Sequence, residues 1–193
     1  MHKRSKLLFA ALIATLALSI GAGTASASRS IEVSPTASTA TFPALVFSSS
    51  EGGVSITCRV VLTQRLHERI AKTVGALVGF ITEVDVRECR GGGAIVRRET
   101  LPWHLQLVSF TGTLPRITSV RLRIIRATFL LEVFGVRCRY QGNPEGTTNG
   151  PEVTSLRADP AISIPGGGEF LCPPSGNFAG SATVSPTVRM RLV

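Results

Sequence analysis

The segment His67-Glu68-Arg69-Ile70-Ala71 is the nearest approach in this chain to a metal-binding motif. It begins like the zinc pattern His-Glu-x-x-His. A metalloprotease needs the second histidine one helical turn after the first, so that both imidazoles reach the same ion. Ala71 stands at that position. The segment therefore predicts no zinc site, and we expect no metal.

The other residues able to do acid–base chemistry are scattered. His104 lies in an alternating segment and is predicted to face solvent from a strand. A Ser-His-Asp triad is assembled in space, so the sequence leaves it open, but no Gly-x-Ser-x-Gly motif accompanies Asp85 or Asp159. The acidic group Glu83, Asp85 and Glu88 fits a polar strand face better than the paired carboxylates of a glycosidase. We assign no catalytic residue, and a small secreted hydrolase with an unrecognised site stays the alternative function.

Two glycine runs, at residues 91–93 and 166–168, could suggest phosphate loops. Neither is followed by Lys-Ser or Lys-Thr at the start of a helix, which a phosphate-binding loop requires. We predict turns there and no cofactor.

Arginine is the one charged residue that forms a pattern. Three extended segments each carry two arginines at alternate positions, namely Arg121, Arg123, Arg137, Arg139, Arg189 and Arg191. Alternate residues share one face of a strand, so neighbouring strands would gather six guanidinium groups on one surface. Such a surface would bind an anionic cell-envelope polymer with salt-sensitive affinity, and the plainer interpretation is a solvated face. No aromatic side chains alternate with the arginines to stack on bases, so nucleic acid is not an expected partner.

The chain has four cysteines, Cys58, Cys89, Cys138 and Cys172. None are spaced as Cys-x-x-Cys, and an even number in an exported chain favours two disulfides, with three possible connectivities. We favour Cys58–Cys89 and Cys138–Cys172, because sequential pairing joins neighbouring strands by loops of comparable size. Cys89–Cys138 is the rival, since Trp103 lies between them as in an immunoglobulin core. Tyr140, however, follows Cys138 by two residues where an immunoglobulin corner tyrosine would precede it.

Residues 1–27 have the features of a signal peptide. A basic head is followed by an apolar run over residues 7–20, and Ala25-Ser26-Ala27 supplies the small-x-small cleavage pattern. The run is shorter than the roughly 20 residues that a membrane-spanning helix needs. Cleavage after Ala27 removes three basic residues and no acid, so the net charge falls from +9 to +6. We predict a secreted, extracellular protein with no integral membrane association after cleavage.

The remaining chain is predicted to form one all-β domain, an antiparallel two-layer β-sandwich over residues 44–193. Apolar and polar residues alternate with period two over residues 54–63, 103–108, 119–124, 127–133, 136–140 and 188–192. The phase of the alternation shifts at residues 125–126, which indicates a bulge or bend within the sheet. Trp103 follows Leu101-Pro102 at a strand start and is predicted to lie in the core near the Cys89 disulfide.

Three segments depart from this alternation. Residues 28–43 are rich in Ser, Thr and Ala and are predicted to be a mobile leader. Residues 62–78 carry apolar residues every fourth position, which leaves helix and strand both open over residues 66–81. We favour a turn or helical turn at residues 67–72, followed by a strand. Residues 141–151 hold three glycines and two prolines and are predicted to be a loop with no central strand.

A resemblance can be stated from several short motifs. They are Ile70-Ala71-Lys72 followed by Gly75-x-Leu77-x-Gly79, Cys89 with glycines after it, Leu101-Pro102-Trp103-His104, and Phe110-Thr111-Gly112-Thr113-Leu114-Pro115. In these the chain resembles a group of uncharacterised secreted proteins from GC-rich Gram-positive soil bacteria. The resemblance implies an exported β domain and carries no catalytic residues. We therefore expect a secreted, non-enzymatic domain of the cell envelope or medium.

Overall fold

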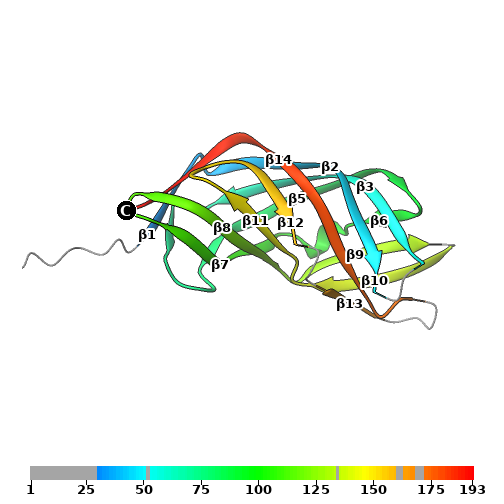
Figure 1. Ribbon diagram of the computed structural model, residues 1–193. Coiled ribbons are helices and arrows are strands. Elements are labelled where there is room, and N and C mark those ends of the chain that lie inside the picture. Colours follow the sequence, from blue (N-terminus) through cyan, green and yellow to red (C-terminus); the bar gives the residue numbers. More distant parts are fainter. Residues whose placement is uncertain (1–29, 51–52, 134, 160–162, 168–171) are drawn as a thin grey trace, which may run out of the picture.

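The protein is built almost entirely of antiparallel β-strands (Figure 1). The computed structural model describes residues 30–193 except 51–52, 134, 160–162 and 168–171. The predicted signal peptide, residues 1–27, lies outside the described residues. The strands are β1 (Ser30–Ser34), β2 (Ala37–Ser49), β3 (Ser55–Leu66), β4 (Arg69–Ala71), β5 (Leu77–Arg90), β6 (Gly93–Ile95), β7 (Trp103–Thr113), β8 (Arg116–Ile125), β9 (Ala127–Val133), β10 (Val136–Gly142), β11 (Glu145–Asn149), β12 (Glu152–Ala158), β13 (Ser163–Gly167) and β14 (Ser175–Leu192).

Helical structure is minimal in the described part of the chain. One 3₁₀ turn, Arg98–Thr100, precedes β7. Nothing in the described ranges forms a helix with the length and hydropathy that a membrane span requires. The predicted all-β, antiparallel fold is confirmed.

Eight of the strands close into a ring. Going round it, the order is β2, β3, β5, β7, β8, β11, β12 and β14, and β14 pairs with β2 again. Every neighbouring pair is antiparallel. Successive side chains of a β-strand point to opposite faces of the sheet, so each strand directs every second side chain into the ring. In β3 these are Ile56, Cys58, Val60 and Leu62, which are all buried. The two separate layers predicted from the sequence do not follow from this strand order.

The ring is densely filled at the end nearer the C-terminus. There β1 pairs with the last residues of β14, placing Ile31 opposite Leu192, and β4 pairs with the other edge of β1. Ile31, Val33, Ile117 and Val188 are each no more than 1% exposed. This end is a packed core with little room for a ligand.

A smaller sheet packs against the other half of the ring. It contains β6, β9, β10 and β13, and it joins the ring where β13 pairs with β14 (Figure 1). The contact is aromatic, because the Phe47 ring of β2 meets the rings of Phe129 at 6.2 Å and Tyr140 at 4.9 Å between centroids. Phe178 of β14 completes the cluster, 4.9 Å from Phe129. Edge-to-face contacts of this kind add to the free energy gained by burial alone.

Both disulfides form in the connectivity favoured from the sequence. Cys58–Cys89 links β3 to β5 within the ring, and Cys138–Cys172 ties β10 to the segment before β14. Glu88, beside Cys89, has a positive φ of 53° at a register shift between the two strands. An extra residue in the left-handed conformation is typical of a β-bulge, and here it brings Cys89 opposite Cys58. The two disulfides confirm the predicted pairing.

Most of the segment predicted to be a mobile leader in fact forms strands, and one of them belongs to the ring. Residues 30–43 form β1 and the first half of β2, while residues 28–29 lie outside the described residues. Ser38 and Ala40 point inward and are buried, as is Phe42. The alternation of inward and outward residues was not detected here, because Ser, Thr and Ala differ little in hydropathy.

Two further segments differ from their predicted structure. Residues 141–151, predicted to be a loop, contain β11, which lies between β8 and β12 in the ring. A side chain at Gly146 would meet Leu156 Cδ1 at 2.9 Å, so this glycine permits close packing of β11 on β12. Residues 67–72 form no helical turn: β4 occupies Arg69–Ala71, and the predicted strand beyond it is β5.

The phase shift at residues 125–126 marks a change of sheet. Arg126 has a φ of 55°, and its N–H donates to Asn143 Oδ1 at 2.9 Å. The chain turns there from β8 in the ring to β9 in the smaller sheet. The irregularity was predicted at the correct position. A bulge or bend within one sheet was expected, whereas the chain passes there from one sheet to the other.

Candidate functional site

An apolar cavity of about 140 Å³ lies in the half of the ring beside the smaller sheet. Inward side chains of β2, β3, β5, β7, β8, β12 and β14 form its wall, and Phe129 and Leu131 of β9 cover it from the smaller sheet. The aromatic cluster of Phe47, Phe129 and Phe178 belongs to this wall. The cavity therefore lies where the two parts of the fold meet.

Several apolar residues of the wall keep accessible surface although they point inward. Val84, Val86, Leu156 and Phe178 are only partly buried. A bound apolar molecule would remove this surface from water, at about 25 cal/mol per Å². The chemistry of the wall therefore suits an apolar ligand.

Three residues that line the cavity have polar side-chain groups: Gln64, Trp103 and Glu145. Gln64 Nε2 donates to Ser38 Oγ at 2.9 Å. The indole N–H of Trp103 is buried and has no acceptor among the described residues. The Glu145 carboxylate is held by Arg121 and Arg123 and is not available as a free base.

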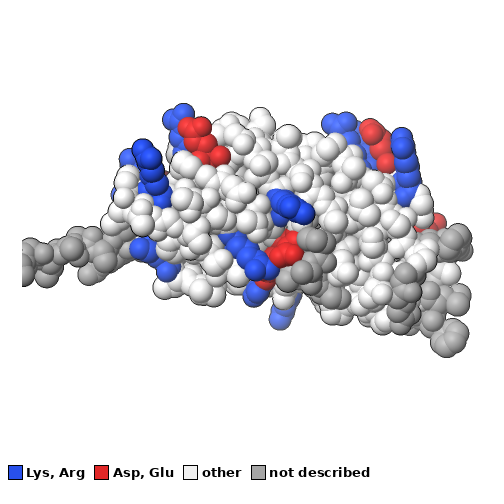
Figure 2. Space-filling model, viewed as in Figure 1, with Lys and Arg blue, Asp and Glu red and all other residues white. Residues whose placement is uncertain are grey.

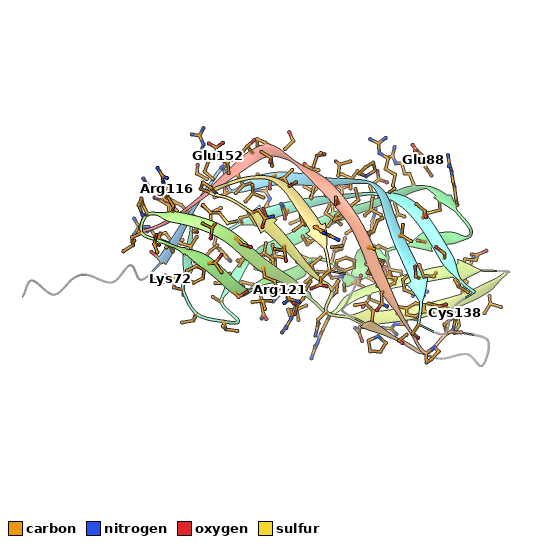
Figure 3. All side chains as sticks on the ribbon, viewed as in Figure 1. Lys72, Glu88, Arg116, Arg121, Cys138 and Glu152 are labelled. Carbon is orange, nitrogen blue, oxygen red and sulfur yellow. A yellow bond between two sulfur atoms is a disulfide. The ribbon has the colours of Figure 1, made fainter. Side chains whose placement is uncertain are left out.

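The cationic residues singled out in the sequence do not share one surface. β8, β10 and β14 are not consecutive: β10 pairs with β9 and β13, and β8 meets β14 only where Arg116 lies opposite Arg191. Figure 3 shows Arg121 and Glu152, the partner of Arg189, on opposite sides of the ring. On the face drawn in Figure 2, the Lys and Arg side chains form small separate groups.

Five of the six arginines are paired with carboxylates. Arg121 and Arg123 contact Glu145, and Arg121 also donates to Asp159 at 2.5 Å. The other pairs are Arg137 with Glu132, Arg189 with Glu152, and Arg191 with Glu32. Arg139 is exposed and has no ion pair with another described residue. Anion binding by these residues stays a prediction, and an anion would have to compete with the carboxylates at five of them.

The pair at Glu32 has an electrostatic signature. The hydrogen bond from Arg191 lowers the pKa of the Glu32 carboxyl below its ordinary value, and the charges of Arg191 and Arg69 lower it further. A low pKa keeps the carboxylate ionised across the physiological range. The charged pair therefore joins β1 to β14 at neutral pH.

The two histidines among the described residues lie on the outside of the ring, away from the cavity. His67 and His104 flank the Phe80 ring at 5.6 and 5.2 Å between centroids. Both are exposed, and within the described residues neither side chain is hydrogen-bonded to a carboxylate or a serine. Three or more His, Cys, Asp or Glu side chains placed to hold a metal do not occur in the described ranges. No observation here favours the hydrolase alternative.

Comparison with protein-family models, curated proteins and solved structures found no match to this chain. The functional argument therefore depends on the cavity and its wall.

The sequence missed the cavity, although it predicted most of the inward residues. Alternation predicts which side chains point inward but not how much space they leave. One signal was available: Gln64 occupies an inward position between Leu62 and Leu66. A polar residue at such a position often marks a functional site, because burial without partners is costly.

Proposed function

We propose that this protein is an exported, non-enzymatic binding domain that holds a small apolar molecule in its interior cavity. The observation that carries the proposal is the apolar cavity of about 140 Å³ between the ring and the smaller sheet. An engineered apolar cavity of about 150 Å³ in another protein stays dry and binds benzene. A ligand of similar size is therefore the natural occupant.

The proposed affinity is modest. Small ligands gain at most about 1.5 kcal/mol per non-hydrogen atom and usually much less. A ring of six or seven carbon atoms would then bind with a dissociation constant on the order of 0.1–1 mM. The cavity is smaller than the roughly 300–1,000 Å³ typical of drug-sized ligands.

Export is supported by the disulfides together with the N-terminal segment. Disulfides persist in oxidising compartments outside the cytoplasm. Cys58–Cys89 and Cys138–Cys172 account for all four cysteines of the chain. We place the protein in the cell envelope or the extracellular medium.

Binding of methylenecyclohexane, a seven-carbon hydrocarbon, tests the proposal. Titration into the mature protein should shift the amide NMR signals of the wall residues and saturate at millimolar concentrations. Val86→Phe, which fills the cavity from β5, should abolish these shifts.

Val61→Phe is the matched control. Val61 lies on the neighbouring strand β3, opposite Asp85 on the outer face. This variant should bind the hydrocarbon as the wild type does. No saturable shifts in the wild-type protein, or equal binding by the Val86→Phe variant, would refute the proposal.

A further inference from the structure

Four inward residues form a row across neighbouring strands of the ring. Ser38 of β2 lies opposite Gln64 of β3, Gln64 opposite Ile81 of β5, and Ile81 opposite Trp103 of β7. Directly paired residues of antiparallel strands project from the same face. The row therefore places two polar groups, the Gln64 amide and the Trp103 indole, at one level of an otherwise apolar wall.

The Trp103 indole N–H is the unsatisfied member of this row. The side chain is 6% exposed, and its Nε1 is buried without an acceptor among the described residues. Tryptophan can only donate, so this group needs an acceptor from elsewhere. A buried donor with no partner is destabilising, and such a group in a native protein calls for an explanation.

The cavity wall also limits the charge of a ligand. Lysine, arginine and histidine are absent from the lining side chains, which all belong to the described part of the chain. The Glu145 carboxylate is already satisfied by Arg121 and Arg123. A carboxylate or ammonium ligand would be desolvated without a counter-ion, which is strongly unfavourable.

We propose that the ligand is a small neutral carbonyl compound whose oxygen accepts a hydrogen bond from the Trp103 indole N–H. This inference rests on the proposed function and names the chemical class of the ligand. Its hydrocarbon part fills the apolar cavity, and its oxygen accepts from the Trp103 N–H, which has no other acceptor among the described residues. The Gln64 amide, in contrast, already donates to Ser38 Oγ at 2.9 Å.

Two isosteric probes separate the inference from the proposed function. Cyclohexanone and methylenecyclohexane differ only in an oxygen where the hydrocarbon has a CH₂ group. Water solvates cyclohexanone better than methylenecyclohexane, and this difference is the same for every protein variant. The ratio of the two dissociation constants is therefore measured for each variant, and these ratios are compared. Trp103→Phe removes the N–H and keeps an aromatic ring, so it should weaken cyclohexanone relative to methylenecyclohexane by about three- to tenfold.

Ile81→Val is the matched control, because it alters the same row without changing a polar group. It should change the two dissociation constants by similar factors and leave their ratio unchanged. An unchanged ratio in Trp103→Phe, with methylenecyclohexane still bound, would overturn the inference and leave the proposed function standing. Failure of wild-type protein to bind either probe would overturn both.

A second measurement needs no variant. The chain has one tryptophan, so the indole N–H gives a single assignable NMR signal. Cyclohexanone should move its proton signal downfield, as hydrogen bonding to a carbonyl does, whereas methylenecyclohexane should not. Equal effects of the two probes on this signal would contradict a hydrogen bond.

Discussion

Arg121 Nε lies 2.6 Å from Glu145 Oε2, and the glutamate side chain is only 4% exposed. Arg123 contacts the other oxygen of the same carboxylate. The pairing joins β8 to β11, the strand that was not predicted from the sequence. It therefore stabilises the ring at a chain segment that is rich in glycine and proline. Breaking a buried pair by removing one partner leaves uncompensated charge.

Glu145→Gln should therefore lower the free energy of unfolding by about 1–3 kcal/mol. A fully buried pair would cost more, but the Arg121 and Arg123 side chains are 37% and 41% exposed, and water screens the charges that remain. Equilibrium unfolding in urea measures the change.

Glu132→Gln provides the control for that experiment. Glu132 pairs with Arg137 across β9 and β10, and both side chains are well exposed, at 43% and 68%. The loss should stay within about 0.5 kcal/mol. Equal decreases in the free energy of unfolding of the two variants would show that the burial of Glu145 does not strengthen its ion pairs.

The two disulfides should contribute similar amounts to stability. Their cysteines are 31 and 34 residues apart, and the chain-entropy model gives about 3.5–4 kcal/mol for loops of this length. Replacing either pair by alanine should lower the urea midpoint by comparable amounts. A much smaller effect at Cys138–Cys172 would indicate that the smaller sheet unfolds independently of the ring.

Much of the strand structure could be predicted because bulky apolar residues alternate with polar ones. This holds for β3, β7, β8 and β14, whose inward residues are buried as expected. Closure of the ring could not be predicted, because it depends on β2 and β11. Their inward positions are filled by small residues such as Ser38, Ala40 and Gly146, which have no hydropathy signal.

The candidate site was less accessible to sequence reasoning than the fold. Trp103 was predicted to be buried, and this is confirmed. Its role in a cavity wall depends on the register of β5 and β7 and on the approach of β9, and both are tertiary properties. The arginine pattern was misleading in another way. Alternation within each strand suggested that the arginines of β8, β10 and β14 share one surface, but these strands are not consecutive neighbours.

We expect ionisation of Tyr140 to lower the stability of the protein at alkaline pH. Burial raises the pKa of its phenol above the ordinary value of about 10. As the pH rises, the phenol therefore ionises in the unfolded chain before it ionises in the folded protein. The contribution of this group to the free energy of unfolding is fully present below about pH 10 and is lost as the pH rises through the folded-state pKa. Tyr140 is the only tyrosine, so ultraviolet absorbance of phenolate reports on it alone.

The control for this titration is Tyr140→Phe, which removes the ionisable group together with the hydrogen bond from Tyr140 Oη to the Pro173 carbonyl, 3.0 Å long. This variant should lose stability at neutral pH and show a weaker dependence above pH 10. Phenolate formation in the native protein at the pH of free tyrosine would contradict the prediction.

Export should leave a defined N-terminus. Cleavage after Ala27 makes Ser28 the first residue of the mature protein, two residues before β1. Mass spectrometry of protein recovered from culture medium should give the corresponding mass with both disulfides oxidised. Recovery of the intact chain from the membrane fraction would contradict the predicted cleavage.

Trp103 offers the most direct test of how the cavity half of the ring is packed. Its burial predicts blue-shifted fluorescence that iodide quenches poorly, and the signal belongs to one residue because the chain has one tryptophan. Trp103→Ala should cost about 3–5 kcal/mol in the free energy of unfolding, because it enlarges an existing cavity. Emission close to that of free tryptophan, with ready quenching, would place the indole in solvent and remove it from the cavity wall.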